Sequence, residues 1–245
     1  MDELDKVLEK KLPVGIQSGV FHLSYFPPAY RFHFNAHNLV VYGKEGDKYI
    51  ISDPIMETPV SLTHAELKKV RYAKGTYPPK GRMYYMKEVP QDYDLKKAIV
   101  RGIKKTTREM LGIPVPLFGV KGIRYMARRM KKWPAKLGPK KASLYLGQVV
   151  RMLEEIGTGG AGFRFMYAAF LQEAARELQQ DWLNECSQEM TAIGDRWREF
   201  ALIAGRIFKG REGKDESYVA AADILLEIAD REEKVYRRLK QIKKN

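Results

Sequence analysis

The sequence has little cysteine and no long apolar run, and both absences exclude classes of protein. Cys186 is the only cysteine among 245 residues, which excludes a disulfide framework and a zinc site built on cysteines. No apolar run approaches the roughly 18 residues that a membrane-spanning helix requires. The first residues also lack the basic start and apolar stretch of a signal peptide. We therefore expect a cytoplasmic protein.

Acidic residues are nearly absent from one interval. Between Lys96 and Lys141 there are 15 basic residues and a single acid, Glu109, which accounts for the whole net charge of +14. The remaining 199 residues carry 29 side chains of each sign. We call residues 96–141 the basic belt. Such a segment indicates an anionic partner and says little about the fold.

With 44% hydrophobic and 11% aromatic residues, the chain has enough apolar surface to bury a core. Residues 1–91 alternate as strands do and contain two short helical patterns. We predict an antiparallel sheet there, with a five-residue hairpin loop at 43–47. The predicted helices and strands are 2–11, 14–23, 39–42, 49–52, 83–86 and a further helix that has Ser61 or Thr63 as its N-terminal cap.

Residues 92–245 have a helical period almost throughout. The fourth of the predicted helices is long, and we expect it to break near Asp181 or Gly194. The predicted helices are 94–111, 120–132, 140–156, 163–209 and 216–242. The fold class is therefore α+β, with an antiparallel α+β domain at 1–91 followed by a mainly helical domain at 92–245.

The basic belt lies on the polar faces of two amphipathic helices. A solvated helix face usually mixes both signs, whereas unbalanced like charges repel, so the pattern favours docking of a partner. An acidic protein, an anionic membrane and a nucleic acid all stay open, although no nucleic-acid-binding motif accompanies the belt. Phe118, Tyr125 and Trp133 are expected in the core. The candidate binding residues are Arg101, Lys104, Lys105, Arg124, Arg128, Arg129, Lys131 and Lys132.

Two of the four histidines, His33 and His37, directly precede a predicted strand. With a hairpin loop at 43–47, His37 falls opposite Asp53, close enough for a carboxylate to orient an imidazole. A one-residue slip would separate them onto opposite faces. His37 and Asp53 are thus the candidate base and orienting acid of a nucleophilic site, against the alternative of an edge histidine and an ordinary turn. No third ligand joins His33 and His37, so we expect neither a metal nor a bound cofactor.

A glycine-rich turn separates two of the predicted helices. Glycines before a helix leave backbone N–H groups free to bind an anion, and this turn matches neither a Walker loop nor a dinucleotide fingerprint. A candidate phosphate or acyl site and a tight helix connection with Arg164 in a structural ion pair remain alternatives. The residues concerned are Gly157, Thr158, Gly159, Gly160 and Arg164.

Two stretches of the chain resemble a known family. Residues 37–54, from His37 to Pro54, are similar to the His-to-Asp segment of papain-like leader-peptidase domains. Together with residues 157–171, from the glycine turn to Leu171, they resemble the butirosin-biosynthesis protein H type. Such proteins have a papain-like N-terminal part and a helical C-terminal part. Their characterised member transfers an aminoacyl chain from an acyl carrier protein to an aminoglycoside.

The resemblance implies an acyltransferase-like protein with His37 as base and Asp53 as its orienting partner. The phosphopantetheine of an acyl carrier protein would present the acyl group, and the belt would dock that acidic carrier. Only the His and Asp half of a Cys-His-Asp site is present, because no cysteine precedes His37; Ser18 and Ser24 sit in strand-like sequence. A truncated chain, a shortened gene product and a member without the chemistry stay open. The alternative function is a non-catalytic binding or assembly module.

Overall fold

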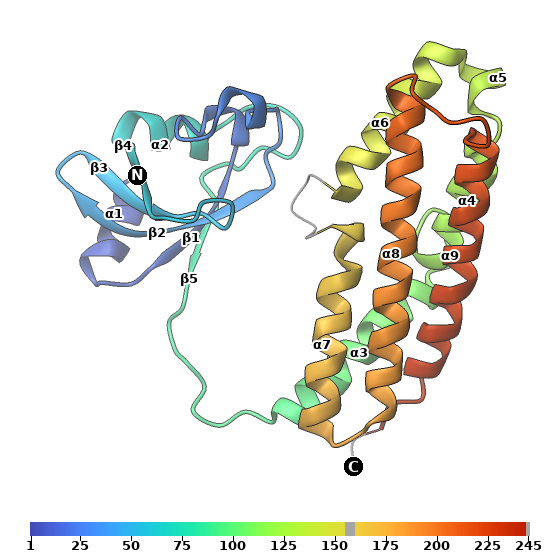
Figure 1. Ribbon diagram of the computed structural model, residues 1–245. Coiled ribbons are helices and arrows are strands. Elements are labelled where there is room, and N and C mark those ends of the chain that lie inside the picture. The colour runs from blue at the N-terminus through green and yellow to red at the C-terminus, as the bar shows by residue number, and fades with distance from the viewer. Residues whose placement is uncertain (155–159, 244–245) are drawn as a thin grey trace. The chain divides into compact units, whose positions relative to one another are not determined.

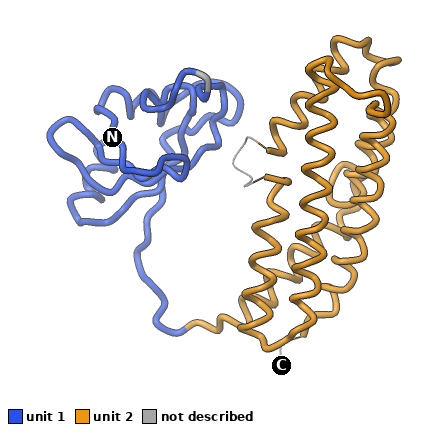
Figure 2. Tube along the Cα trace, viewed as in Figure 1, with its two compact units in different colours: residues 1–92 blue, residues 93–245 orange. Residues whose placement is uncertain are grey.

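The computed structural model describes residues 1–154 and 160–243. The chain forms two compact units, residues 1–92 and 93–245 (Figure 2). Unit 1 carries a five-stranded sheet, whereas the described part of unit 2 is helical (Figure 1). The predicted α+β class is confirmed at this level.

The sheet of unit 1 is antiparallel throughout, with strand order β4-β3-β2-β1-β5. Two helices accompany it, α1 (Asp2–Glu9) and α2 (His64–Arg71). The strands are β1 (Val14–Ser18), β2 (His37–Glu45), β3 (Lys48–Ser52), β4 (Val60–Thr63) and β5 (Met83–Tyr85). Strand β1, which lies between β2 and β5, is buried along its whole length, so this part of the sheet lies in the core of the unit.

Two predictions for unit 1 are wrong in detail. The strand predicted at 14–23 ends at Ser18, and a 3₁₀ turn, η1 (Val20–His22), follows it. The loop predicted at 43–47 is shorter than expected, because β2 continues to Glu45 and pairs there with Lys48. The turn is only Gly46 and Asp47, and Gly46 adopts the positive φ of 59° that two-residue hairpin turns demand.

The start of α2 is fixed by its own side chains. Thr63 accepts a hydrogen bond from the Glu66 backbone, and the Glu66 carboxylate accepts one from the Thr63 backbone in return. This reciprocal capping box satisfies two N–H groups that the first turn of a helix leaves without partners. Of the two predicted caps, Ser61 and Thr63, the second is the one used.

Unit 2 is built around its longest helix, α8 (Trp182–Phe208), which packs against α6, α7 and α9 (Figure 1). The other helices are α3 (Leu95–Gly112), α4 (Gly119–Met130), α5 (Trp133–Leu137), α6 (Pro139–Glu154), α7 (Arg164–Leu178) and α9 (Tyr218–Leu239). No helix in the described ranges has both the length and the apolar character needed to cross a membrane.

The long helix predicted at 163–209 breaks at one of the two expected places. α7 ends at Leu178, and Gln179 takes a left-handed conformation just before Asp181. Gly194 instead stays within α8, where a side chain added at that position would collide with the Phe165 ring. This glycine therefore permits the close approach of α7 to α8, and does not interrupt a helix.

A buried carboxylate connects three segments of unit 2. Glu232 of α9 is fully buried and accepts hydrogen bonds from Arg164 Nε, at 2.8 Å, and from Trp197 Nε1, also at 2.8 Å. A second bond joins Arg164 Nη2 to the other carboxylate oxygen at 3.1 Å. Burial alone would lower the pKa of Arg164, but the charge of Glu232 outweighs it and raises that pKa. The start of α7 is thus held against α8 and α9.

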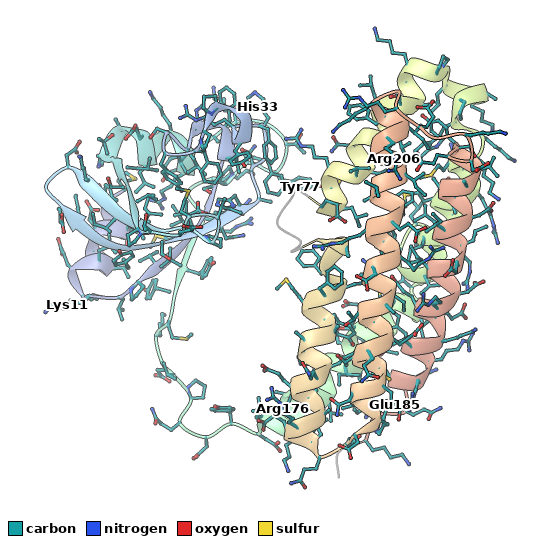
Figure 3. All side chains as sticks on the ribbon, viewed as in Figure 1. Lys11, His33, Tyr77, Arg176, Glu185 and Arg206 are labelled. Carbon is teal, nitrogen blue, oxygen red and sulfur yellow. The ribbon has the colours of Figure 1, made fainter. Side chains whose placement is uncertain are left out.

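We predict that Glu232→Ala destabilises unit 2 by about 3–5 kcal/mol, because it leaves Arg164 charged and Trp197 without an acceptor in the interior. Urea unfolding followed by circular dichroism measures the loss. The matched control is Glu185→Ala, at a residue labelled in Figure 3. It removes an exposed ion pair with Arg238 and should cost less than about 1 kcal/mol. Equal losses for both variants would contradict a special role for Glu232.

Candidate functional site

His37 and Asp53 meet at one end of two neighbouring strands. His37 is the first residue of β2, and Asp53 directly follows the last residue of β3. His37 Nε2 lies 2.7 Å from Asp53 Oδ2. The Asp53 side chain is fully buried, and that of His37 is 12% exposed. The contact expected between these two side chains is present.

The register that creates this contact differs from the expected one. Val40 pairs with Ser52, so continuation of the ladder sets Asp53 beside Leu39, not beside His37. His37 then lies two residues further along on the same face, within diagonal reach of Asp53. The prediction of the contact was right although the register was wrong by two residues, because an even slip keeps a side chain on its face.

A bulge in β2 is the reason that the observed register differs from the predicted one by an even number of residues. Near the turn Gly43 pairs with Ile50, whereas Val41 pairs with Ile51, so one extra residue of β2 is accommodated between Val41 and Gly43. Without it, Val41 would pair with Ser52, and Asp53 would point to the face opposite His37.

Asp53 accepts two more hydrogen bonds. The Tyr25 hydroxyl donates to Oδ2 at 2.7 Å, and the Ile55 backbone N–H donates to Oδ1 at 2.9 Å. Burial by itself raises the pKa of the Asp53 carboxyl, but the bonds from His37, Ile55 and Tyr25 outweigh it, so the pKa is lowered. Burial, and to a smaller extent the hydrogen bond to Asp53, raises the pKa of Tyr25 well above its usual range. At neutral pH the site therefore holds an ionised Asp53 and a protonated Tyr25.

This charge state fixes the proton on His37. An ionised carboxylate only accepts hydrogen bonds, so Nε2 of His37 must carry a hydrogen. A neutral His37 then has its lone pair on Nδ1, and that nitrogen is the one able to take a proton from another group. The Phe26 ring, whose centroid lies 5.9 Å from that of His37 at an angle of 65°, packs beside the imidazole. Chemically, the pair is an oriented general base.

The segment before His37 is held in place by side chains that the sequence patterns do not reveal. Buried Gln17 donates to the Asn35 carbonyl at 2.7 Å and accepts from Arg82 at 2.7 Å. Asn35 in turn donates to the Thr76 carbonyl at 2.9 Å. Neither this network nor Tyr25 has a periodic signal, because all of these residues except Gln17 lie in loops.

Neither serine near the pair is placed as a nucleophile. Ser18 is fully buried opposite His37 and donates its hydroxyl to the His37 carbonyl at 3.1 Å. Ser24 is exposed, and its side chain bonds to Glu66. Cys186 is buried in the core of unit 2, where burial raises the pKa of its thiol.

His33, labelled in Figure 3, stacks on the Phe21 ring with the centroids 4.3 Å apart. Its partner is thus an aromatic ring, and it does not join His37. Within residues 1–154 and 160–243 there is no group of three or more His, Cys, Asp or Glu side chains suited to a metal ion.

Part of the basic belt is neutralised within unit 2. Arg124 of α4 pairs with Asp230 and Glu233 of α9, and Lys131 pairs with Asp223 of the same helix. The sequence argument that the belt is unbalanced is therefore wrong for these two candidates, because α9 supplies the missing acids. No ion pair to another described side chain is found for Arg101, Lys104, Lys105, Arg128, Arg129 and Lys132.

The expected burial of the belt aromatics is wrong for two of them. Phe118 is 55% exposed and Tyr125 is 37% exposed, while Trp133 is half-buried. Tyr125 carries the Arg129 guanidinium over its ring, at 5.5 Å from the centroid. A pocket opens beside it that no acidic residue lines, and we call it the aromatic–basic pocket. Its lining is Tyr125, Arg128, Arg129, Lys132, Trp133, Lys136, Leu137 and Tyr145.

The glycine-rich turn is described only in part, since Gly157, Thr158 and Gly159 lie outside the described residues. Gly160 has a positive φ of 82°. Arg164 makes the structural ion pair with Glu232, and its remaining Nη1 donates to the Gly162 carbonyl at 2.7 Å. Of the two alternatives for Arg164, the structure shows the ion pair.

We predict that Asp53→Asn lowers the stability of unit 1 at pH 7 by about 2 kcal/mol, because charge-assisted bonds are lost. The folded-state pKa of Asp53 lies below its ordinary 3.8, so its stabilisation is complete above that pH and is lost on acidification through the folded pKa. Urea unfolding from pH 7 to pH 3 measures this. The difference in the free energy of unfolding between Asp53→Asn and wild type should become smaller toward pH 3. Exposed Asp47→Asn is the control, and a constant difference for Asp53→Asn would contradict the prediction.

Comparison with known families gives two matches. The model of butirosin biosynthesis protein H, N-terminal, matches residues 1–54, which include both His37 and Asp53. The model of a domain of unknown function, DUF4872, matches residues 65–239, well over half of the chain. A search of the curated proteins finds no match. The chain belongs to the DUF4872 family, and its N-terminal segment is similar to butirosin biosynthesis protein H.

Proposed function

We propose that this protein takes part in carrier-protein-dependent acyl transfer, with His37 as general base and Asp53 as the residue that orients it. The observation that supports this most is the bond from His37 Nε2 to ionised Asp53, which leaves Nδ1 to accept a proton. Both residues lie within the match to butirosin biosynthesis protein H, N-terminal. An antiparallel sheet that presents this pair at a strand end is also consistent with a papain-like unit 1.

The nucleophile in this proposal is a cysteine thiol from outside the 245 residues, because Cys186 is buried in unit 2. His37 Nδ1 takes the thiol proton as sulfur attacks the thioester carbonyl. The tetrahedral intermediate then expels the thiol of the carrier, which recovers the proton from Nδ1, and the acyl group remains on the attacking sulfur. Asp53 stabilises the imidazolium throughout and keeps Nε2 protonated.

The acyl donor in this proposal is the phosphopantetheine thioester of an acidic acyl carrier protein in the cytoplasm. The aromatic–basic pocket supports this partner, since four cations surround three aromatic rings there without an acid among them. An acidic helix that carries an apolar side chain would complement both features. Docking on unit 2 raises the local concentration of the tethered thioester at unit 1.

The base can be tested with small molecules. We expect the protein to accelerate acyl transfer from an N-acetylcysteamine thioester to added cysteamine, because His37 removes the proton of the attacking thiol. His37→Gln should reduce the enzymatic rate about 100-fold, and Asp53→Asn should reduce it less. Chromatography of the acylated cysteamine measures the rate.

The control for this experiment is His33→Gln, which removes another imidazole of unit 1 that stacks on Phe21. It should leave the rate unchanged. Equal rates for His37→Gln and His33→Gln, or a rate for wild type that does not exceed the buffer, would contradict a catalytic base and favour a non-catalytic binding module.

The docking surface can be tested by charge reversal. The triple variant Arg128→Glu, Arg129→Glu, Lys132→Glu should raise the dissociation constant for a holo acyl carrier protein at least tenfold, and rising salt should weaken wild-type binding. Fluorescence anisotropy of a labelled carrier measures both effects. Lys131 is left unchanged because it pairs with Asp223.

The matched control reverses three other belt charges, Lys97→Glu, Arg101→Glu and Lys105→Glu, and so alters the net charge by the same amount. These side chains are exposed on α3 and do not line the aromatic–basic pocket. We expect a much smaller effect on the dissociation constant. An equal effect would mean that only total charge matters, which would contradict docking at the pocket.

A further inference from the structure

A second pocket in unit 2 gathers cations from three helices. It lies where α3, α4 and α9 meet, and its volume is about 570 Å³. The cations that line it are Lys104 and Arg108 of α3, Lys121 of α4, Arg237 at the end of α9 and Lys240 just after it. We call it the polycationic pocket. It shares no lining residue with the aromatic–basic pocket.

The charges of this pocket are not balanced by its own lining. Glu233 is the only acid that lines it, and this carboxylate accepts hydrogen bonds from both Arg124 and Arg237. Five cations against one acid leave the lining with a net charge of +4. Like charges held around one cavity repel, and an anion inside the cavity removes that cost.

A second and independent observation comes from Thr107. This residue of α3 also lines the pocket, yet it is only 2% exposed. Its hydroxyl is buried and has no hydrogen-bond partner among the described residues. A buried hydroxyl without a partner is destabilising, and such groups are rare in folded proteins unless a ligand or water completes them. Thr107 therefore places a hydroxyl without a partner next to a strongly positive cavity.

We propose that the polycationic pocket binds a ligand that carries a diphosphate group. A diphosphate bears several negative charges in a small volume, as a lining charge of +4 requires, and its oxygens accept hydrogen bonds from lysine, arginine and a hydroxyl. Leu111 and Gly112 form an uncharged wall, beside which a less polar part of the ligand fits. This assignment rests only on unit 2 and is independent of the reaction proposed for His37.

Inorganic pyrophosphate is the probe, and isothermal titration calorimetry at fixed ionic strength measures its dissociation constant for the full chain. We expect saturable binding with one ligand per chain. Lys104→Gln combined with Arg108→Gln should raise the dissociation constant at least tenfold. Lys105→Gln is the matched control, because Lys105 is exposed on the same helix and does not line the pocket, and it should change the constant less than twofold.

Thr107 gives the sharper test. Thr107→Val removes the hydroxyl at nearly constant volume and should weaken pyrophosphate binding about tenfold, whereas Thr107→Ser retains the hydroxyl and should keep most of the affinity. Without ligand, Thr107→Val should also raise the melting temperature, since it deletes a buried donor that has no partner. Differential scanning fluorimetry with and without pyrophosphate reads both effects.

Three results would overturn the proposal. One is the absence of saturable pyrophosphate binding at millimolar concentration. Another is a double variant, Lys104→Gln with Arg108→Gln, that binds pyrophosphate no more weakly than Lys105→Gln does, while Thr107→Val also binds it as tightly as wild type. The third is tighter binding of citrate than of pyrophosphate, which would assign the pocket to carboxylates. Loss of thioester exchange in a His37 variant has no bearing on any of these results.

Discussion

One additional residue in β2 determines which side chains share a face of the unit 1 sheet. From the turn to Gly43 the two strands follow one register, and from Val41 onward they follow another. A strand alternates its side chains strictly, so this single residue reverses the face of everything that precedes it. His37, Leu39 and Val41 therefore lie on the face of Ile51 and Asp53, and the hydrogen-bonded cluster of His37, Asp53 and Tyr25 exists only because of the bulge. Tyr25 then adds a constraint from the loop between β1 and β2.

In unit 2 the distribution of charge depends on which helix packs beside which. In the sequence the belt and the acids of α9 are more than 80 residues apart, but in space α4 lies along α9. Asp223, Asp230 and Glu233 neutralise two belt residues and leave the others in separate groups. Two pockets of different character lie along the belt. One is aromatic and basic and is lined by α4, α5 and α6. The other is lined by five cations and one acid, together with Thr107, Leu111 and Gly112, and lies where α3, α4 and α9 meet.

Much of the secondary structure follows from local rules, and the corrections have non-local causes. Helical period located the helices of unit 2 to within a few residues, except for the short α5, and Thr63 was one of the two caps predicted for α2. The sequence did not decide between Asp181 and Gly194 as the break, because the role of Gly194, close contact with Phe165, involves a separate helix. The His37–Asp53 contact was predicted through a wrong register, since the turn is shorter than predicted and the bulge in β2 has no reliable sequence signal. Tyr25, Gln17 and Thr107 were not found because only the folded chain shows what surrounds them.

The burial of Cys186 has a practical consequence. A thiol reacts with alkylating reagents as an exposed thiolate, and Cys186 is 2% exposed with a raised pKa. Its reaction therefore requires a local or global opening of the bundle. Unit 1 contains no cysteine, so alkylation does not report on the opening of unit 1. The rate at which Cys186 is alkylated therefore reports how often the helices around α8 separate.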